Sequence, residues 1–374
     1  MATQFSEELL LRSKLTPPGG NQFELCIFGR GVGESILLHL GESKFLVVDS
    51  FKRFKSKQPV VLEYLEHIGL GADAIEIIVV SHWHDDHIRG VSDMVEQCKF
   101  ATIYVPSAVQ SKEFISLLAT FTSCPALATH FTSGVFEMER CLGFLESEVK
   151  AGNPLRLKFA SANTNIFRDK AGTVDALSPS TMENLDALAE YLALMPDDKK
   201  PGTRGLLRPT NPNNCAIALW VELFGKRVIL GSDLEERNDV NRGWTAVCGL
   251  NPQPMMVAGV HKIPHHGSET AHHQPVWDNY VNREGLSLLT PYARGVSKLP
   301  RTGDVERLKF LSNNVFCTSD PSHELKVRER PSKVERMAQS RVKAKIVVDS
   351  KLGMIRVRGD SSADVQLFGA SLTL

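Results

Sequence analysis

Long apolar runs, paired cysteines and an excess of charge of one sign are all missing from this sequence. No apolar run reaches the roughly 18 residues of a membrane-spanning helix, so we expect no membrane contact. The first residues carry acids and no basic stretch, so we expect no signal peptide. The seven cysteines are scattered and never form Cys-x-x-Cys, which indicates reduced thiols rather than disulfides or a cysteine zinc site. These absences predict a cytoplasmic protein.

The charges of the chain balance, with 43 basic and 43 acidic residues and a formal net charge of +0. A binding surface for a polyanion such as nucleic acid must therefore be local. The composition, 42% hydrophobic and 23% charged, is that of a globular protein, and 374 residues can bury a large core. We predict a lead-in over residues 1–20 and a single domain over residues 21–374.

Six consecutive residues after a β-like apolar run at 75–80 carry the strongest functional signal. They read His-Trp-His-Asp-Asp-His at 82–87. Imidazole nitrogen and carboxylate oxygen are ligands that suit zinc, manganese or iron. A strand followed by a tight loop can direct several side chains into one cavity. We therefore predict four metal ligands in this motif, His82, His84, Asp86 and His87; the alternative is a histidine-rich surface loop.

Two later strand ends offer the remaining ligands of a two-ion site. Asp233 follows an apolar strand and a Gly-Ser pair, which lets the backbone approach an ion; the alternative is an ordinary helix N-cap. His265 and His266 follow another strand, and we favour His265 as the ligand and His266 as a neighbour of the ligands or the substrate. Asp49 closes a further strand, where we expect it to orient a ligand histidine or to be a turn residue.

Strand and helix patterns alternate along the chain, which favours a layered α/β fold. The first part predicts strands at 23–28, 35–40, 44–49 and 101–105 and helices at 59–68 and 91–98. Residues 106–210 are less regular, with helical patterns near 109–121, 134–150 and 181–195. After a predicted loop at 196–214, strands are expected at 215–223, 227–230, 286–290, 344–348 and 354–357.

These motifs, in this order, resemble the metallo-β-lactamase superfamily from about residue 23 to 358. The segments at 27–35, 213–215 and 262–268 further resemble the soluble hydrolase domain of the bacterial competence proteins that handle DNA during uptake. The resemblance implies a four-layer αββα sandwich with a helical and loop insertion at about 106–210. Most superfamily members have a further metal-binding histidine where this chain has 210–214, so one ion would be held more weakly, or by asparagine or water.

The resemblance also implies a chemistry with two divalent ions, Zn²⁺ or Mn²⁺. One ion would be held by His82, His84 and Asp233, and the other by Asp86, His87, Asp233 and His265. Asp86 and Asp233 are thus the candidate catalytic carboxylates. A metal-bound hydroxide would act as the nucleophile, so no serine nucleophile is needed.

A basic run at 51–57 beside Asp49 favours a phosphodiester substrate, and we expect DNA as that substrate and a nuclease as the function. It holds four basic and two aromatic residues, which suits phosphates and bases, and Lys52 and Arg53 are its candidate substrate contacts, with Asn214 nearby. Residues 326–345, with eight basic and two acidic residues, form a second candidate face. Either segment is alternatively a solvated surface.

Two other functions stay open at this point. One is a small-molecule hydrolase acting on a lactone, an amide or a cyclic nucleotide, with residues 106–210 covering a closed pocket. The other is a non-catalytic scaffold stabilised by metal and working with a partner protein. A partner protein or a homo-oligomer is compatible with either function.

Overall fold

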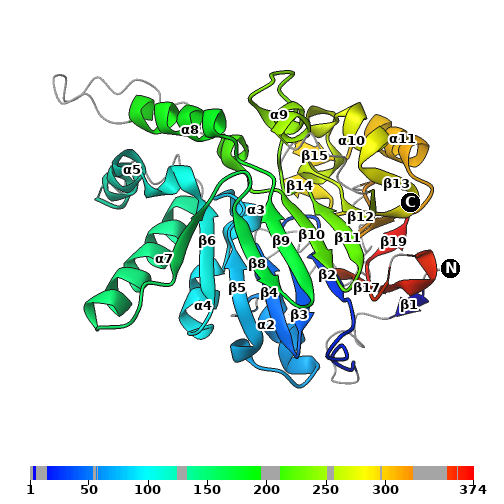
Figure 1. Cartoon of the computed structure of the whole chain (residues 1–374), viewed down its shortest axis with the longest axis horizontal. Helices are drawn as coiled ribbons and strands as arrows, with labels where there is room; N and C mark the ends of the chain where they lie inside the picture. Colours follow the sequence, from blue (N-terminus) through cyan, green and yellow to red (C-terminus); the bar gives the residue numbers. More distant parts are fainter. Residues whose placement is uncertain are drawn as a thin grey trace, which may run out of the picture.

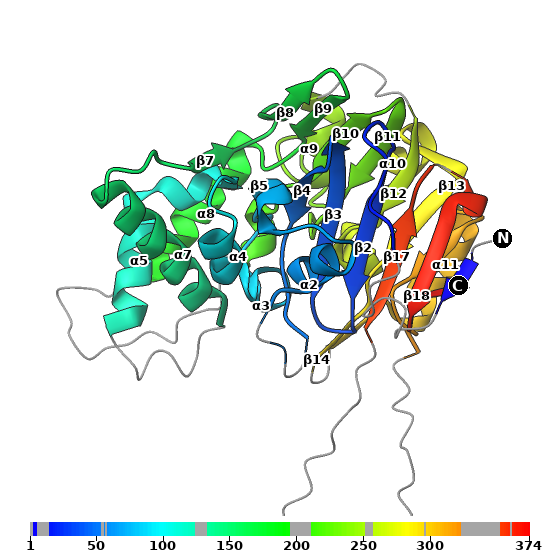
Figure 2. The same cartoon turned by 90° about the horizontal axis from the view of Figure 1, so that it is seen from below.

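Two mixed β-sheets form the centre of the computed structural model (Figures 1 and 2). The structure describes residues 3–5, 15–53, 56, 58–123, 133–194, 211–250, 257–294, 297–322, 352–359 and 361–374. The first sheet runs in the order β1 (Thr3–Phe5), β18 (Val365–Gly369), β17 (Gly353–Val357), β2 (Leu25–Gly29), β3 (Glu34–Gly41), β4 (Lys44–Val48), β5 (Ile75–Val79), β6 (Thr102–Pro106) and β7 (Leu157–Ala160). The second runs in the order β19 (Leu372–Thr373), β16 (Val315–Cys317), β13 (Val281–Leu289), β12 (Ala258–Lys262), β11 (Lys226–Leu230), β10 (Leu219–Leu223), β9 (Gly172–Ala176) and β8 (Asn165–Asp169).

Helices cover the outer face of each sheet. On the first sheet these are α2 (Val60–His67), α3 (Asp85–Ile88), α4 (Val91–Gln97), α5 (Lys112–Ser123), α7 (Ser133–Lys150) and α8 (Thr181–Leu194). On the second they are α9 (Gly243–Leu250), α10 (Gln274–Asn279) and α11 (Thr302–Leu311). None of these helices, within the described ranges, is long and apolar enough to cross a membrane. The layers are therefore helix, sheet, sheet and helix, as the sequence predicts.

Alternation along the strands explains how both faces of a sheet become buried. On β3, Ile36 and Leu38 point into the core between the sheets, whereas Leu37 packs toward the helices. On β5, Ile77 and Val79 likewise join the inter-sheet core and Ile78 joins the helical side. Successive side chains of a strand face opposite ways, so a strand buried on both faces is a continuous apolar run.

The carboxyl ends of the parallel strands gather the predicted site residues. β4 and β5 are parallel neighbours in the first sheet, and β11 and β12 are parallel neighbours in the second. Asp49 follows β4, and its backbone N–H donates to the carbonyl of Val79 at 2.9 Å. The sheets meet beside the motif, where Ile217 N–H donates to the carbonyl of Ser81 at 3.0 Å. Asp233 and the 265–266 pair follow β11 and β12, so the fold brings four separate strand ends together.

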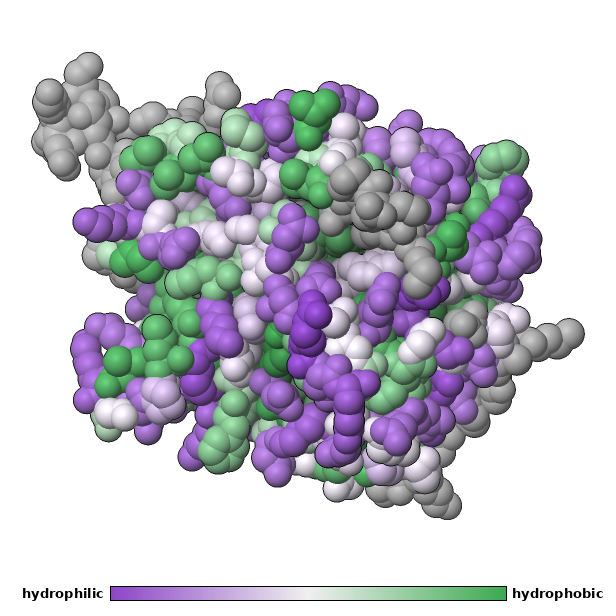
Figure 3. Space-filling model, in the orientation of Figure 1, coloured by the Kyte–Doolittle hydropathy of each residue, from purple (hydrophilic) through white to green (hydrophobic). Residues whose placement is uncertain are grey.

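Residues 106–210 contribute to both sheets as well as to the helical layer. β7 extends the first sheet, and β8 and β9 form an edge of the second, while α5, α7 and α8 pack at one end of the molecule. Apolar residues gather over this end in Figure 3; on α5 and α8 the exposed ones include Ile115, Leu185 and Leu192. The assignment of residues 21–374 to a single domain stays a prediction.

Several predicted elements differ from the observed ones. The strand predicted at 215–223 begins only at Leu219, and the sequence patterns did not indicate α9, α10 or α11. These helices are short, so their apolar periodicity is weak and tertiary packing decides their structure. The strand predicted at 344–348, the basic segment at 326–345 and most of the loop at 196–214 lie outside the described residues.

A buried histidine in β12, His261, predicts how the stability of the protein changes with pH. His261 is 1% exposed and its ring packs edge-on against Trp277, with centroids 4.8 Å apart. Burial, with a smaller contribution from Lys262, lowers its pKa from 6.5 to about 3. The unfolded chain therefore takes up a proton below about pH 6.5 that the folded chain does not. The free energy of unfolding should fall between about pH 6.5 and 3, by up to about 1.4 kcal/mol per pH unit.

The variant His261→Phe tests this prediction. Urea unfolding at several pH values between 7 and 4 should show a slope against pH that is smaller by about one proton. An unchanged slope would rule out His261 as the source of this acid sensitivity.

Candidate metal centre

The motif at 82–87 forms a buried turn that leads from β5 into α3. Its two remaining side chains point away from the four predicted ligands and fix the turn. The ring of Trp83 packs against Phe114 of α5, with centroids 6.0 Å apart. Asp85 Oδ1 accepts a 2.8 Å hydrogen bond from the backbone N–H of Gly134 in α7. The helical layer thus sets the direction of the motif.

Asp49 and Ser81 fix the orientation of two of the histidine rings. Asp49 Oδ2 accepts from His87 Nδ1 at 2.7 Å and from the Ser81 hydroxyl at 2.6 Å. Since the one hydroxyl proton of Ser81 goes to Asp49, His82 Nδ1 must donate to Ser81 Oγ, 3.0 Å away. Both rings therefore turn Nε2 away from Asp49. Asp49 lies where the sequence placed it, against a predicted ligand histidine.

The variant Asp49→Asn should loosen the orientation of His87. An amide of the same shape accepts at one end only, so it would lose either the protons of His87 and the Ser81 hydroxyl at Oδ2 or the Ser81 backbone N–H that Oδ1 accepts at 2.7 Å. We expect the affinity for Zn²⁺ to fall about 10–100-fold, the usual effect of losing such a supporting partner. Calorimetric titration measures this, with Asp175→Asn on β9 as a control that should bind normally. Equal affinity in both variants would contradict the assigned role of Asp49.

Asp233 and His266 complete the cluster from the second sheet. Asp233 lies 3.4 Å from His87 Nε2, 3.5 Å from His266 Nε2 and 3.9 Å from His82 Nε2. His266 Nδ1 donates to the carbonyl of Thr290 at 3.0 Å, which leaves Nε2 3.1 Å from Asp86 Oδ2. The third ring therefore repeats the pattern of His82 and His87, with Nδ1 donating to a support and Nε2 facing the carboxylates.

His265, which the sequence analysis favoured as the ligand, points elsewhere. Its Nδ1 lies 2.9 Å from Thr270 Oγ1 and 3.2 Å from Glu235 Oε1, and its Nε2 lies 3.4 Å from Asn213 Nδ2. Both histidines have positive φ, 45° and 52°, so the backbone turns sharply between them. That turn directs only His266 into the cluster, and the preference for His265 is corrected.

The arrangement fits divalent ions. One group combines Asp86, His87, Asp233 and His266, and another combines His82, His84 and Asp233, with the candidate ligand atoms of each group within 4.8 Å of one another. Three buried polar atoms of this cluster, His82 Nε2, His87 Nε2 and Asp233 Oδ1, have no hydrogen-bond partner within the described residues. Buried polar groups are normally partnered, and imidazole with carboxylate is a donor set for Zn²⁺ or Mn²⁺. Asp233 belongs to both groups.

The charges of the cluster are strongly coupled. Burial opposes ionisation of Asp86, but His87 and His266 outweigh it and hold the pKa of this carboxyl below its ordinary value. Burial disfavours the charged form of His266, yet Asp233 and Asp86 raise its pKa to about 10. Burial also lowers the pKa of His82 well below its ordinary value. An ion that binds at neutral pH must therefore displace protons from the cluster.

The predicted basic contacts Lys52 and Arg53 are paired with acids. Lys52 forms an ion pair with Asp93 of α4, and Arg53 Nε lies 2.6 Å from Glu63 of α2. The other predicted bases of the 51–57 run fall on residues outside the description. Both side chains therefore have acidic partners in this structure, and their contact with a phosphate stays a prediction.

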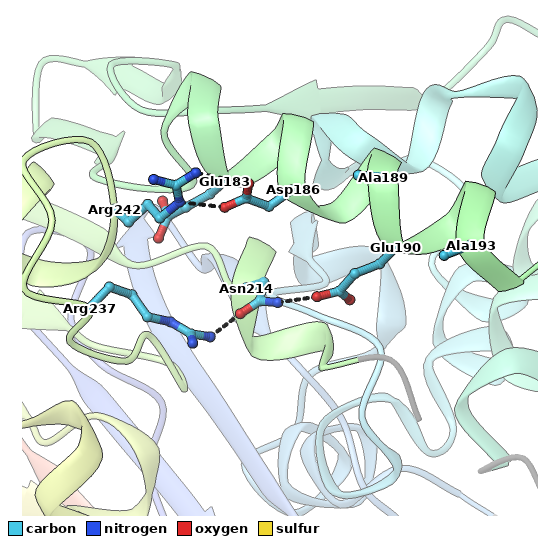
Figure 4. Close-up of a pocket in the computed structure, with 8 residues that line it drawn as sticks. All are labelled: Glu183, Asp186, Ala189, Glu190, Ala193, Asn214, Arg237 and Arg242. Carbon is cyan, nitrogen blue, oxygen red and sulfur yellow. Dashed lines mark hydrogen bonds and ion pairs between the residues drawn. The ribbon is translucent and has the colours of Figure 1, made fainter. Parts of the chain in front are cut away.

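Asn214 lies in a separate hollow of about 470 Å³ beside α8 (Figure 4). It bridges Glu190 and Arg237, and Arg242 pairs with Asp186 at 2.6 Å. The other charged groups of the hollow are partnered too, since Glu183 accepts from the backbone N–H groups of Ser180 and Gly243, and Arg237 pairs with Glu235. Asn214 contacts Glu190 and Arg237 rather than the His/Asp cluster, and its predicted contact with the substrate stays a prediction.

A hairpin that no sequence pattern indicated borders the cluster, formed by β14 (Tyr292–Arg294) and β15 (Ser297–Leu299). The Tyr292 ring stacks on His266, with centroids 5.3 Å apart and planes at 28°. Arg294 Nη1 lies 2.7 Å from Asp85 Oδ2. The strands have three residues each, which gives no periodic signal that sequence reasoning can use.

Comparison with known proteins gives one family match, which covers the first half of the site. Residues 31–113, which include Asp49 and the motif, match the family model described as Metallo-beta-lactamase superfamily. No curated protein matches the chain at a significant level.

Solved structures with similarity to the chain include a metallo-beta-lactamase, SMB-1, bound to 2-mercaptoethanesulfonate, at 14% identity and TM-score 0.35, covering 71% of this chain and 86% of that one. They also include a metallo-beta-lactamase of Cronobacter sakazakii, at 12% and 0.34, covering 68% and 79%. A third is the hydrolase AbOPH of the beta lactamase superfamily, at 16% and 0.29, covering 54% and 57%. Residues 31–113 are therefore similar to the metallo-β-lactamase superfamily, and this stretch includes Asp49 and the motif at 82–87.

Proposed function

We propose that this protein is a metal-dependent hydrolase that uses two divalent ions to cleave a phosphodiester, with DNA as the favoured substrate. The observation that carries the hydrolase assignment is the pair of ligand groups that share Asp233. His82 and His84 would hold one ion with Asp233, and Asp86, His87 and His266 would hold the other with Asp233. When bound, such ions supply hydroxide at neutral pH and polarise the bond under attack.

The protein side chains supply position and charge. Asp49 holds His87, and the Thr290 carbonyl holds His266, so the ligand nitrogens are directed before any ion binds. The ring of Tyr292 covers one face of His266 and limits the access of water from that side. The His/Asp cluster itself is buried, so charges in it act with little screening.

A group of arginines supports an anionic substrate. Three arginines come from different segments: Arg30 follows β2, Arg53 follows β4 and Arg89 follows α3. Burial lowers the pKa of the Arg30 guanidinium, and the positive charges of Arg89 and Arg53 lower it further. Arg89 is exposed and lies two residues after His87. Within the described part of the chain, neither Arg30 nor Arg89 forms an ion pair, whereas Arg53 is paired with Glu63. Two unneutralised guanidinium groups near the cluster suit a phosphate. The resemblance to the competence hydrolase domain points to the same class.

Three substrates in parallel test the proposal: bis(p-nitrophenyl) phosphate, single-stranded DNA and a chromogenic β-lactam, each with added Mn²⁺ or Zn²⁺. We expect cleavage of the phosphodiesters that a chelator stops, and little effect on the lactam. The double variant Arg30→Ala, Arg89→Ala should raise the KM for DNA, whereas Arg168→Ala on β8 should not. Hydrolysis of a lactam or lactone with no phosphodiester cleavage would contradict this proposal and indicate a small-molecule hydrolase. Metal binding without any hydrolysis would also contradict it and indicate the non-catalytic scaffold.

A further inference from the structure

A fully buried ion pair lies between the two sheets, just behind the cluster. Lys262 ends β12 of the second sheet and Glu34 begins β3 of the first. Their side chains are 0% and 1% exposed, and Lys262 Nζ lies 2.8 Å from Glu34 Oε1. Desolvation makes such a pair a poor source of stability, since apolar residues of similar volume often serve as well or better. The pair therefore needs another explanation.

The second contact of Lys262 leads to Asp233. Lys262 Nζ donates to the carbonyl of Ser232 at 3.2 Å, and Ser232 directly precedes Asp233. The same carbonyl accepts from the backbone N–H of His265 at 2.9 Å. Ser232 has a φ of +47°, a conformation that is unfavourable for a residue with a side chain. Lys262 thus holds the strained residue that aims the shared carboxylate.

The second contact of Glu34 leads to His266. The Thr290 hydroxyl donates to Glu34 Oε2, and the Thr290 carbonyl accepts from His266 Nδ1. Thr290 is 0% exposed, so its position depends on the groups that contact it. The next residue, Ser35, donates to the carbonyl of Asp49 at 2.8 Å, so the start of β3 supports the first half of the site too.

We propose that Lys262 and Glu34 are positioning residues, which set Asp233 and His266 at the right place and direction to hold a divalent ion. One residue separates each member from a ligand of the cluster, Ser232 between Lys262 and Asp233 and Thr290 between Glu34 and His266. The ion pair joins these two connections across the sheets. This inference rests on the proposed function, because it assumes that the cluster binds metal.

The double variant Glu34→Leu, Lys262→Met separates a positioning role from a structural one. It replaces the pair with apolar side chains, so the chain should fold and keep a thermal midpoint near that of the wild type. We expect its affinity for Zn²⁺ or Mn²⁺ alone, whichever the wild-type chain binds more tightly, to fall about 10–100-fold in calorimetric titration. A matched control, Glu24→Leu, Arg358→Met, removes another ion pair, formed by the residue before β2 and the residue after β17, in which Arg358 Nε lies 2.5 Å from Glu24. The control should bind the ion as the wild type does.

A second variant keeps the proposal testable if the double variant does not fold. Thr290→Val removes the hydroxyl link to Glu34 but retains the carbonyl that holds His266. Its metal affinity should also fall, by roughly 3–10-fold, as for the loss of one supporting hydrogen bond. Wild-type affinity in a folded double variant, or in Thr290→Val, would overturn the positioning role. If the wild-type chain binds neither ion, the proposed function fails and not this inference alone.

Discussion

The variant Asp233→Ala should lose both bound ions and nearly all hydrolytic activity. Asp233 is the one carboxylate that belongs to both ligand groups, and its oxygens lie 3.4–3.9 Å from three imidazole nitrogens. Removing it leaves one group without an anionic ligand and the other with only Asp86. The loss of a shared ligand should remove several kcal/mol of transition-state stabilisation, which corresponds to a decrease in kcat of about 10³-fold or more.

Two controls make the result for Asp233 specific. Circular dichroism and thermal unfolding should show that the variant still folds, because Asp233 lies at a strand end rather than in the apolar core. Asp169→Asn, which changes an exposed carboxylate in the hairpin of β8 and β9, should retain full metal content and activity. Retained metal and activity in Asp233→Ala would rule out a shared ligand at this position.

The variants His266→Ala and His265→Ala should differ sharply although the two residues are adjacent. His266 Nε2 lies 3.1 Å from Asp86 and faces the cluster, whereas His265 contacts Thr270 and Glu235 instead. We expect His266→Ala to lose the ion held with Asp86 and His87 and to lower kcat by about 10²–10³-fold, a typical loss for one electrostatic contact to the reacting group. His265→Ala should keep both ions.

The molar metal content of each variant, and a calorimetric titration of each variant with the ion, distinguish the two histidines. The neighbouring His265→Ala is the matched control, because it changes the same turn by the same number of atoms. The reverse pattern, with metal lost from His265→Ala and retained in His266→Ala, would show that the turn has the opposite orientation in solution.

Sequence patterns were sufficient to predict the layered fold, because strand and helix patterns alternate along the chain. The motif after one apolar strand, and aspartates after two others, indicated candidate ligands, and the resemblance grouped them into one site. In the structure Asp86 and Asp233 share a ligand group, and Asp49 accepts a hydrogen bond from His87. The family match over residues 31–113 covers only the first half of this site, and the second half depends on the strand ends themselves.

Tertiary packing decided what the sequence could not. Which of two adjacent histidines faces inward depends on the φ values of one tight turn, and no side-chain pattern encodes these. The sequence gives no sign that Lys52 and Arg53 have acidic partners, because these partners lie on separate helices. Asp93 of α4 and Glu63 of α2 reach the basic residues only through tertiary packing. Arg30 gave no local signal either, since its neighbours Arg53 and Arg89 come from other segments.

The molar metal content of the purified chain, measured by elemental analysis before and after saturation with Zn²⁺ or Mn²⁺, decides whether the His/Asp cluster is a two-ion centre. We predict about two ions per folded chain at saturation and close to none in Asp233→Ala, with hydrolysis that follows the metal content. Hydrolysis that persists after complete removal of metal, or a saturated chain without any bound ion, would contradict this prediction.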